Sequence, residues 1–461
     1  NTPALTSSKN TTHPNIVFVL ADDVSYDNFG FMGNKAVRTP TLDHLAQQGT
    51  VFTTAYVPTA FCRPSLATLL TGQWPHQNRL HANNGVPVLA LGSATLATRL
   101  QQQGYVTFAG GKFWEDEPDL RGFDYYDNRK EEFARQDQDK LWQFLDNFSG
   151  KQPMFIWWAP MIPHQPYNSP QQYVDTVDSS AINLRNIPAD KQQEFIEKEK
   201  QLLGNTAWFD AEFKKLYDNL SNKKQLENTL FIFMADNGFS NRGASKSTPY
   251  ELGIRTPLVF YWPKHFPAQR IDAGVDTVNL YRTVLELAGA PQPSNSTLPG
   301  HSLLPVIEQK TAPAAEKLFG ANYPAYTLKT DPLPRPERDI FALHVRDGDW
   351  KYIFFLRDLR EKDNADLTIQ KGVMPFPERE GGDEELFYLP DDPYERNNLV
   401  NDTEQQARIA QYRREVLQWW FSTGGKPLDV AHHCPEQPAV LCRKLTAAAY
   451  QDLIRTTKQS H

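Results

Sequence analysis

Short runs of apolar residues recur along the chain, and each is bounded by polar or turn-forming residues. The first, residues 16–20, is apolar at every position. This pattern is typical of a strand that is buried on both faces of a parallel sheet. Similar runs predict further strands at residues 51–57, 105–109, 154–160 and 230–234.

Segments with helical spacing of apolar residues lie between these runs. Residues 39–49 have a threonine cap and a closing glycine, residues 95–100 are a shorter example, and residues 190–226 predict a long core-facing helix. Strands that alternate with helices favour an α/β fold. We therefore expect a large, mostly parallel sheet sandwiched by helices.

The pattern changes between about residues 292 and 336, which are rich in proline, serine and alanine. Beyond this stretch, residues 343–355 and 385–389 predict antiparallel strands, and residues 403–421 predict a closing helix. A linker near residues 334–336 would divide the chain into an N-terminal catalytic domain, 1–335, and a smaller C-terminal α+β domain, 336–461, built on an antiparallel sheet.

Composition excludes several classes of protein. The 461 residues are 40% hydrophobic and 22% charged, which is typical of a globular chain and not of a disordered one. The net charge of −7 gives no general attraction for nucleic acid, so an anionic substrate would need local basic residues. No apolar run is long enough to predict a membrane span.

The chain starts without a methionine and without the apolar core of a signal peptide. We expect an exported protein whose signal has been removed, acting in a periplasmic, extracellular or lysosome-like compartment. Two of the three cysteines, Cys434 and Cys442, are close in sequence. They could form a local disulfide, typical of an oxidising compartment, or remain two free thiols.

The third cysteine, Cys62, lies where the strand at 51–57 leads into an apolar helical stretch. Pro64 suits the first turn of a helix and Gly72 suits its end. A cysteine at a helix N-terminus is placed for nucleophilic chemistry, because the backbone amides there stabilise an anion. A buried structural cysteine in a short amphipathic helix is an equal alternative at this point.

Acidic and amide side chains follow two of the predicted buried strands. Asp22 and Asp23 follow the first strand, and Asp236 and Asn237 follow the strand at 230–234. Taken singly, each pair is typical of a solvated turn. Because parallel strands end at one edge of a sheet, the four oxygens could converge on a hard cation.

Several motifs together resemble the type I, formylglycine-dependent sulfatases of the alkaline phosphatase superfamily. The stretch from Cys62 to Gly72 is similar to the family signature, although Leu66 replaces its usual arginine. Later segments that resemble the family contain Lys112, Pro163-His164-Gln165-Pro166, Lys246 and Asp392-Pro393-Tyr394-Glu395. Trp114 falls where the family normally has a histidine.

The resemblance implies a sulfatase that hydrolyses sulfate esters, most simply those of a sulfated carbohydrate. A maturation enzyme would convert Cys62 to formylglycine, whose hydrated form is the nucleophile, and one Ca²⁺ would be bound. The implied catalytic residues are Cys62, Lys112, His164, Lys246 and Asp236. The implied substrate-binding residues are Lys112, Lys246 and His164, to which we add Arg63 because it adjoins Cys62 and the usual arginine is absent at Leu66. The implied metal ligands are Asp22, Asp23, Cys62, Asp236 and Asn237.

Two other functions are compatible with the same motifs. The superfamily also contains phosphoesterases and phosphonate hydrolases, and a chain with Leu66 and Trp114 could bind sulfated glycans without cleaving them. For a sulfated polymer, the acidic net charge argues against a broad basic binding surface and predicts recognition in a pocket around Cys62. Arg63, His81 and Arg121 are the first basic candidates to line that pocket.

Overall fold

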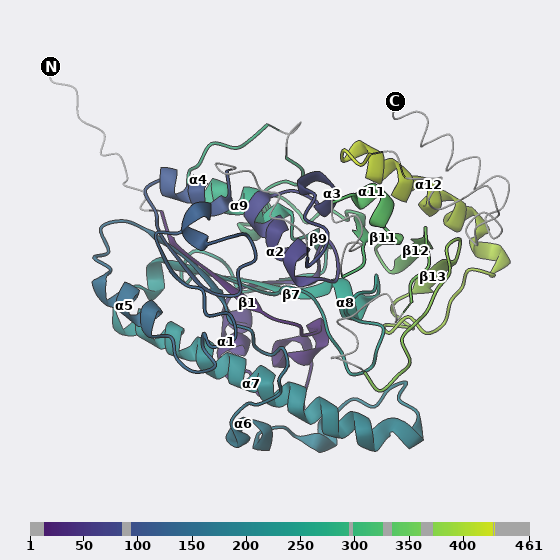
Figure 1. Ribbon diagram of the computed structural model, residues 1–461, viewed down its shortest axis with the longest axis horizontal. Helices are drawn as coiled ribbons and strands as arrows, with labels where there is room; N and C mark the ends of the chain where they lie inside the picture. Colours follow the sequence, from purple (N-terminus) through teal and green to yellow (C-terminus); the bar gives the residue numbers. More distant parts are fainter. Residues whose placement is uncertain are drawn as a thin grey trace.

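Two β-sheets with flanking helices make up the fold (Figure 1). A computed structural model describes residues 13–84, 94–294, 298–325, 334–360, 372–426 and 428. Cys434 and Cys442, the candidates for a local disulfide, lie outside the described residues. Among the residues that are described, no helix is both long and apolar enough to cross a lipid bilayer.

The large sheet has the strand order β4-β3-β5-β1-β6-β7-β2-β8, with β9 paired to β2. Its strands are parallel except for β7, which is antiparallel to both β6 and β2. The predicted mostly parallel sheet is therefore confirmed. Its strands are β1 Asn15–Ala21, β2 Thr50–Tyr56, β3 Val106–Gly111, β4 Tyr125–Asp127, β5 Met154–Ala159, β6 Thr229–Ala235, β7 Arg255–Tyr261, β8 Gln269–Ile271 and β9 Val275–Asp276.

Strand β1 shows why its sequence is apolar throughout. Ile16 and Phe18 belong to one hydrophobic cluster and Val17 and Val19 to another, because alternate side chains point to opposite faces of the sheet. All four are fully buried. A strand in the centre of a covered sheet must therefore be apolar at both odd and even positions.

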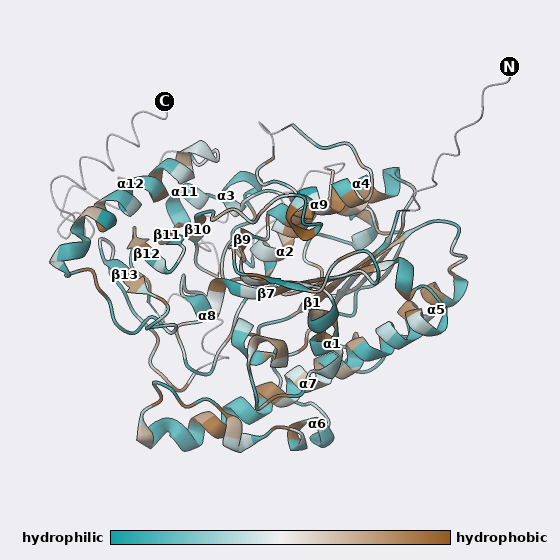
Figure 2. Cartoon of the chain, turned by 180° about the vertical axis from the view of Figure 1, so that it is seen from behind, coloured by the Kyte–Doolittle hydropathy of each residue, from teal (hydrophilic) through white to brown (hydrophobic). Residues whose placement is uncertain are grey.

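Helices cover both faces of the large sheet (Figure 1). One cluster includes residues of α2, α4, α9 and α10, and the other includes residues of α1, α5 and α7. The central strands are mostly hydrophobic in colour, whereas α7 and α12 combine hydrophobic and hydrophilic positions (Figure 2). The helices are α1 Pro40–Gln48, α2 Cys62–Thr71, α3 Pro75–Asn78, α4 Leu96–Gln102, α5 Asp139–Asn147, α6 Gln171–Asp175, α7 Gln192–Asn222, α8 Glu251–Ile254, α9 Asn279–Leu287, α10 Leu304–Ile307, α11 Pro336–Asp339 and α12 Gln406–Ser422.

The small sheet is antiparallel, in the order β10-β11-β12-β13. Helix α12 packs on one face, and Tyr250 packs against the other. The first strand precedes the expected boundary at residue 335, so the small sheet begins earlier in the chain than the division into 1–335 and 336–461 implies. The strands are β10 Leu318–Asn322, β11 Ala342–Asp347, β12 Trp350–Phe355 and β13 Glu384–Tyr388.

A buried ionic network joins the two sheets. Lys351 of β12 lies 2.9 Å from Glu395 and 3.3 Å from Glu251, the first residue of α8. Arg346 of β11 also pairs with Glu251, at 2.7 Å, and Tyr56 at the end of β2 donates a hydrogen bond to the same carboxylate. These contacts hold the small sheet against the edge of the large sheet where β2 ends.

Candidate active site

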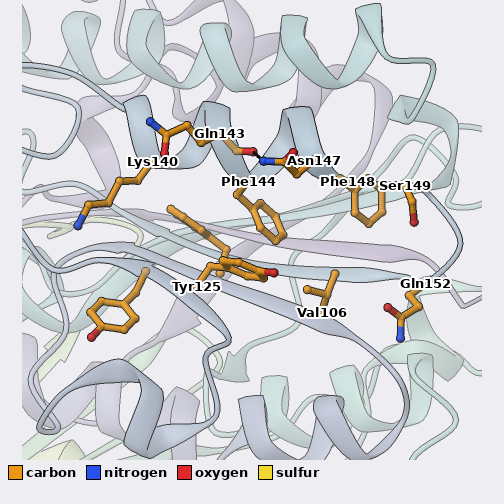
Figure 3. A pocket seen from close by; sticks show the side chains of 11 residues that line it. Val106, Tyr125, Lys140, Gln143, Phe144, Asn147, Phe148, Ser149 and Gln152 are labelled. Atoms are coloured by element: carbon orange, nitrogen blue, oxygen red, sulfur yellow. Dashed lines mark hydrogen bonds between the residues drawn. The ribbon is translucent and has the colours of Figure 1, made fainter.

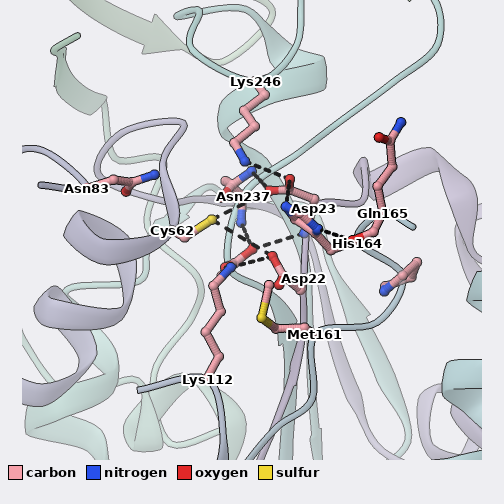
Figure 4. Close-up of polar contacts among 12 residues, drawn as sticks. Asp22, Asp23, Cys62, Asn83, Lys112, Met161, His164, Gln165, Asn237 and Lys246 are labelled. Carbon is pink, nitrogen blue, oxygen red and sulfur yellow. Dashed lines mark hydrogen bonds and ion pairs between the residues drawn. The ribbon is translucent and has the colours of Figure 1, made fainter. Parts of the chain in front are cut away.

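The polar residues predicted at strand ends meet at one edge of the large sheet (Figure 4). Asp22 and Asp23 follow β1, Asp236 and Asn237 follow β6, and Lys112 follows β3. Cys62, the first residue of α2, faces them, with Sγ 3.8 Å from Asp22 Oδ1 and 3.6 Å from Asp23 Oδ1. The convergence expected from parallel strands is thus observed.

Helix α2 begins and ends where its sequence predicts. Cys62 occupies the first turn, and the N–H of Gly72 donates to the carbonyl of Thr68 at 2.8 Å to close the helix. Gly72 has a φ of 68°, and a Cβ atom there would lie 2.7 Å from the ring of Tyr281. Only glycine meets both conditions, so this residue fixes the end of the helix that presents Cys62.

Three buried carboxylates and the thiol form a compact cluster. Ligand atoms of Asp22, Asp23, Cys62 and Asp236 all lie within 4.8 Å of one another. Asn237 adds its amide, which donates from Nδ2 to Asp23 Oδ1 at 2.7 Å. Asp23 has a φ of 54°, a conformation that is uncommon outside glycine and often found at functional sites.

Two oxygens of this cluster, Asp22 Oδ2 and Asn237 Oδ1, are buried and have no hydrogen-bond partner among the residues that the structure describes. Buried polar atoms are normally satisfied, so an unsatisfied pair beside three carboxylates indicates a missing partner. Carboxylate and amide oxygens are the donors that hard cations such as Ca²⁺ prefer. The donor set therefore fits a hard divalent cation.

Lys112 and Lys246 point toward the carboxylates from opposite sides (Figure 4). Lys112 Nζ lies 2.6 Å from Asp22 Oδ1 and 3.3 Å from Asp236 Oδ2, and Lys246 Nζ lies 2.6 Å from Asp23 Oδ2. Both lysines are buried. Two ammonium groups held this close to a nucleophile could bind the oxygens of a tetrahedral anion.

The backbone just before Lys112 explains its position. Gly111 ends β3 with a φ of 87°, and a Cβ atom there would lie 2.2 Å from the carbonyl oxygen of Ala159. The N–H of Lys112 donates to that same carbonyl at 2.6 Å. A glycine at this point lets the chain turn closely past β5 and direct Lys112 at the cluster.

The cluster is electrostatically asymmetric. Burial alone would raise the pKa of Asp23, but Lys246, His164 and Lys112 hold it well below its usual range. Burial, opposed by Lys112 and reinforced by Asp22 and Asp23, raises the pKa of Asp236 to about 7. One carboxyl is therefore strongly ionised while the other is poised to take a proton near neutral pH.

His164 reaches the cluster from a loop after β5. Its Nε2 lies 3.3 Å from Asp23 Oδ2, and the side chain is 21% exposed, more than the other side chains in the cluster. It is thus placed between the buried charges and the solvent side. This is the position from which a leaving group could be contacted.

Two residues hold the His164 loop from outside. The guanidinium of Arg135 donates to the carbonyls of Met161, His164 and Pro166. The amide of Asn205, in α7, donates to the carbonyls of Pro163 at 3.2 Å and Pro166 at 3.3 Å. Neither residue was predicted from the sequence; an asparagine within the apolar stretch of the predicted long helix was the available signal for Asn205, and Arg135 has none.

The three basic residues expected to line the pocket face carboxylates. Arg63 forms a two-pronged ion pair with Glu115, at 2.8 and 3.1 Å. His81 lies 2.8 Å from Asp339, and Arg121 pairs with Asp116. All three are buried. Their assignment to substrate stays a prediction that this geometry does not favour.

Two positions, 66 and 114, depart from the family pattern, and the structure shows what surrounds each of them. Leu66 is buried in the hydrophobic cluster shared by α2 and the sheet. Trp114 lies beside the site, with its ring centre 6.0 Å from Lys112 Nζ and 4.9 Å from Lys130 Nζ. Lys130 was not identified from the sequence, because its proximity to Trp114 depends on how the turn after β4 folds back.

A cavity of about 480 Å³ lies elsewhere, between β4 and α5 (Figure 3). Its lining includes the aromatic residues Phe108, Tyr125, Tyr126, Phe144 and Phe148. None of the residues of the carboxylate cluster lines it. The chemistry of the site is therefore separate from this cavity.

Residues 14–290, more than half of the chain, match the sequence model of the Sulfatase family. The chain belongs to the sulfatase family, within the alkaline phosphatase superfamily, and is a sulfuric ester hydrolase. All residues of the carboxylate cluster and both active-site lysines, from Asp22 to Lys246, lie within this matched region.

Two relatives match most of the chain. The ulvan-active sulfatase of Formosa agariphila is 25% identical over 91% of this chain and 82% of its own length. Arylsulfatase A of Homo sapiens is 28% identical over 88% of this chain and 86% of its own length. Both alignments extend beyond residue 290, so the likeness includes the small sheet as well as the large one.

Solved structures share the fold. The structure of Ps i-CgsB in complex with k-i-k-neocarrahexaose has a TM-score of 0.66 and 25% identity, covering 90% of this chain and 94% of its own. The phosphonate monoester hydrolase of Agrobacterium radiobacter has a TM-score of 0.67 and 17% identity, covering 89% and 96%. The second likeness shows the fold alone.

Proposed function

We propose that this sulfatase hydrolyses sulfate esters of a sulfated carbohydrate, with formylglycine formed from Cys62 and one Ca²⁺ bound beside it. The observation that carries the proposal is the convergence of Cys62 with three carboxylates and two buried lysines. The names of an ulvan-active relative and of a structural neighbour bound to a carrahexaose support a carbohydrate substrate.

Asp22, Asp23, Asp236 and Asn237 would hold the calcium ion. The unpaired Asp22 Oδ2 and Asn237 Oδ1 support this assignment, since a cation would satisfy both atoms. The ion would balance the buried negative charge and polarise a bound sulfate group. Cys62 lies within reach of the same ligands, so the nucleophile and the metal would share one edge of the site.

Formylglycine would supply, when hydrated, an oxygen nucleophile at position 62. Asp236 is the carboxyl that lies beside both Cys62 and Lys112, which places it to take up a proton from such a group. Its Oδ1 accepts from the N–H groups of Asp23, at 3.2 Å, and Asn237, at 2.7 Å, which fixes the carboxyl beside Cys62. Asp236 therefore serves as the general base.

Lys112 and Lys246 bind the sulfuryl oxygens and stabilise the charge that develops on them. Their ammonium groups face the cluster from two sides, so an anion held between them would be oriented toward position 62. His164 contacts the ester oxygen and assists departure of the alcohol. Its partial exposure allows the alcohol portion of a larger substrate to extend toward solvent.

Leu66 is packed among apolar residues and supplies no charge where the family has an arginine. Arg63 is neutralised by Glu115, so it does not supply a free charge beside Cys62. Conversion of Cys62 would then depend on the remaining signature residues, Pro64 and Ser65, and on an external maturation enzyme. We expect the enzyme to act outside the cytoplasm.

Two measurements on protein from the native host test the proposal. Mass spectrometry of the peptide that contains residue 62 should show formylglycine in place of cysteine. Release of inorganic sulfate from sulfated mono-, oligo- and polysaccharides should then be detected. A persistent thiol, or activity confined to small aryl sulfates, would contradict it.

Phosphonate and phosphate ester hydrolysis is the second candidate, because the fold is shared with a phosphonate monoester hydrolase. Sulfate and phosphate esters have similar tetrahedral shapes, so the lysine pair alone does not separate them. Matched sulfate and phosphate esters of the same sugar distinguish the two. A higher kcat/KM for the sulfate ester is expected.

A further inference from the structure

Lys130 is an exposed lysine in the turn between β4 and α5, and its ammonium group lies 4.9 Å from the centre of the Trp114 ring. The same ring centre is 6.0 Å from the ammonium group of Lys112. One indole thus connects the buried lysine of the active site to a second, exposed lysine. The separation of the two ammonium groups cannot exceed the sum of these distances, which is within the span of a disaccharide.

Lys130 forms no direct ion pair within the part of the chain that the structure describes, although Glu115 and Glu117 lie near enough to attract it. By contrast, nearby Arg63 pairs with Glu115 and Arg129 pairs with Asp127 and Asp137. Partial desolvation of the ammonium group, although the residue as a whole is exposed, followed by repulsion from Lys112 and Arg63 and opposed by attraction to Glu115 and Glu117, lowers the pKa of Lys130. An anion bound at Lys130 would relieve this repulsion.

Trp114 accounts for the placement of this cation. An ammonium group over an indole face is attracted by the ring, which limits where the flexible lysine chain can reach. Trp114 stands where a histidine is usual in the sequence pattern of these enzymes. The exchange replaces a group that can transfer protons with a ring that positions a second positive charge.

We propose that Lys130, positioned by Trp114, binds a second anionic group of the substrate, a sulfate or carboxylate on the sugar next to the one whose ester is cleaved. This inference rests on the proposed function of the site. It makes Lys130 a substrate-binding residue and Trp114 its positioning residue. The substrate class narrows accordingly to glycans with at least two anionic groups on adjoining sugars.

Binding measurements test this without turnover. The full chain carrying Cys62→Ala is titrated calorimetrically with disaccharides in matched pairs, each pair differing only in a second sulfate or a carboxylate on the neighbouring sugar. Lys130→Gln in this background should weaken binding of the doubly anionic member about tenfold, the loss of one charge-assisted hydrogen bond. Binding of the singly anionic member should be unchanged.

Further variants separate the roles. Lys130→Arg should retain most of the affinity, and Trp114→Leu should weaken the doubly anionic member less than Lys130→Gln does. Lys224→Gln removes another exposed lysine, located just after α7 and before β6, and should change neither member. Pairs with sulfate and pairs with carboxylate show which anion the subsite prefers.

The inference is overturned if Lys130→Gln affects both members of a pair equally, or neither, or if Lys224→Gln has the same effect. It is also overturned if the second anionic group does not improve binding to the starting protein. Failure of the proposed function would give a different experimental result. In that case protein with residue 62 intact releases no sulfate from any of the sugars, whatever the binding pattern at Lys130.

Discussion

The ammonium group of Lys246 lies 2.6 Å from Oδ2 of Asp23, although 223 positions separate the two residues in the sequence. Lys112 makes the equivalent contact with Asp22, also at 2.6 Å. Each carboxylate that follows β1 thus has its own buried lysine. The same two lysines are the groups that would meet a sulfate group, so they are placed to exchange carboxylate contacts for substrate contacts.

We predict that Lys112→Ala and Lys246→Ala each lower kcat by about 10²–10³-fold, because both act on charge that develops in the transition state. Initial rates of sulfate release measure this, and circular dichroism confirms that the variants are folded. Lys264→Ala, which removes an exposed lysine paired with Glu227, is the control. Unfolding of either active-site variant would show that the lysine is structural.

Calcium should stabilise the folded chain. At a concentration one hundred times its Kd, an ion that binds only the folded state adds about 2.7 kcal/mol, which raises Tm by several degrees. Thermal melting with CaCl₂, with MgCl₂ and with a chelator measures the effect. Asn237→Ala should abolish the calcium shift, while Asp218→Asn, an exposed control, should retain it. Equal Tm values with Ca²⁺ and chelator would contradict the assignment.

Arg135→Lys should lower kcat by about tenfold or more with a smaller change in KM. A lysine cannot reproduce the planar set of donors with which Arg135 binds the carbonyls of the loop that carries His164. The loop would then hold His164 less accurately, and small displacements of a catalytic group are costly. Steady-state kinetics on one sulfated substrate check the split between kcat and KM.

Arg129→Lys is the matched control, because Arg129 pairs with Asp127 and Asp137 and, among the described residues, forms no hydrogen bond or ion pair with that loop. It should leave kcat unchanged. Asn205→Ala should act in the same direction as Arg135→Lys. A variant of Arg135 with a lower Tm but an unchanged kcat would mean that the residue only supports the fold.

Glu199→Gln should make stability less dependent on pH. Glu199 is buried in α7, where it accepts a hydrogen bond from Asn241 at 2.9 Å, and burial raises its pKa from 4.5 to about 7. The folded state therefore binds a proton that the unfolded state has released, so this group's contribution to stability is lost as pH rises from about 4.5 through 7.

Glutamine does not titrate, so the variant stays uncharged at position 199 at every pH. We expect it to gain up to about 3 kcal/mol over the unmodified chain at pH 8 and to show little difference at pH 4.5. Urea unfolding at a series of pH values measures the difference. A gain that is the same at pH 4.5 and at pH 8 would rule out the titration of Glu199 as its cause.

Lys351→Met should destabilise the chain by about 3–5 kcal/mol, since it leaves Glu395 and Glu251 buried without their shared cation. The double variant Lys351→Met with Glu395→Gln should recover part of the loss. Denaturant unfolding monitors both. If the single and double variants are equally unstable, the ionic contact between the two sheets is not the cause.

Much of the fold could be predicted from local patterns. The apolar positions of β1 and the glycine after α2 are constraints that act within a few residues, so the sequence carries them directly. The meeting of Asp22 with Asp236 followed from one further rule, that parallel strands end at the same edge of a sheet. Such rules need no knowledge of individual side-chain contacts.

Only the tertiary structure decided which basic side chains form ion pairs with carboxylates and which are placed near the active site. Arg63 is adjacent to Cys62 in sequence, yet its guanidinium pairs with Glu115. Lys130, which no sequence pattern singled out, lies over the ring of Trp114. Arg135 reaches three carbonyls of a loop that begins 26 residues later. An ion pair depends on where two distant backbones bring their side chains, and periodicity along the chain contains no record of that distance.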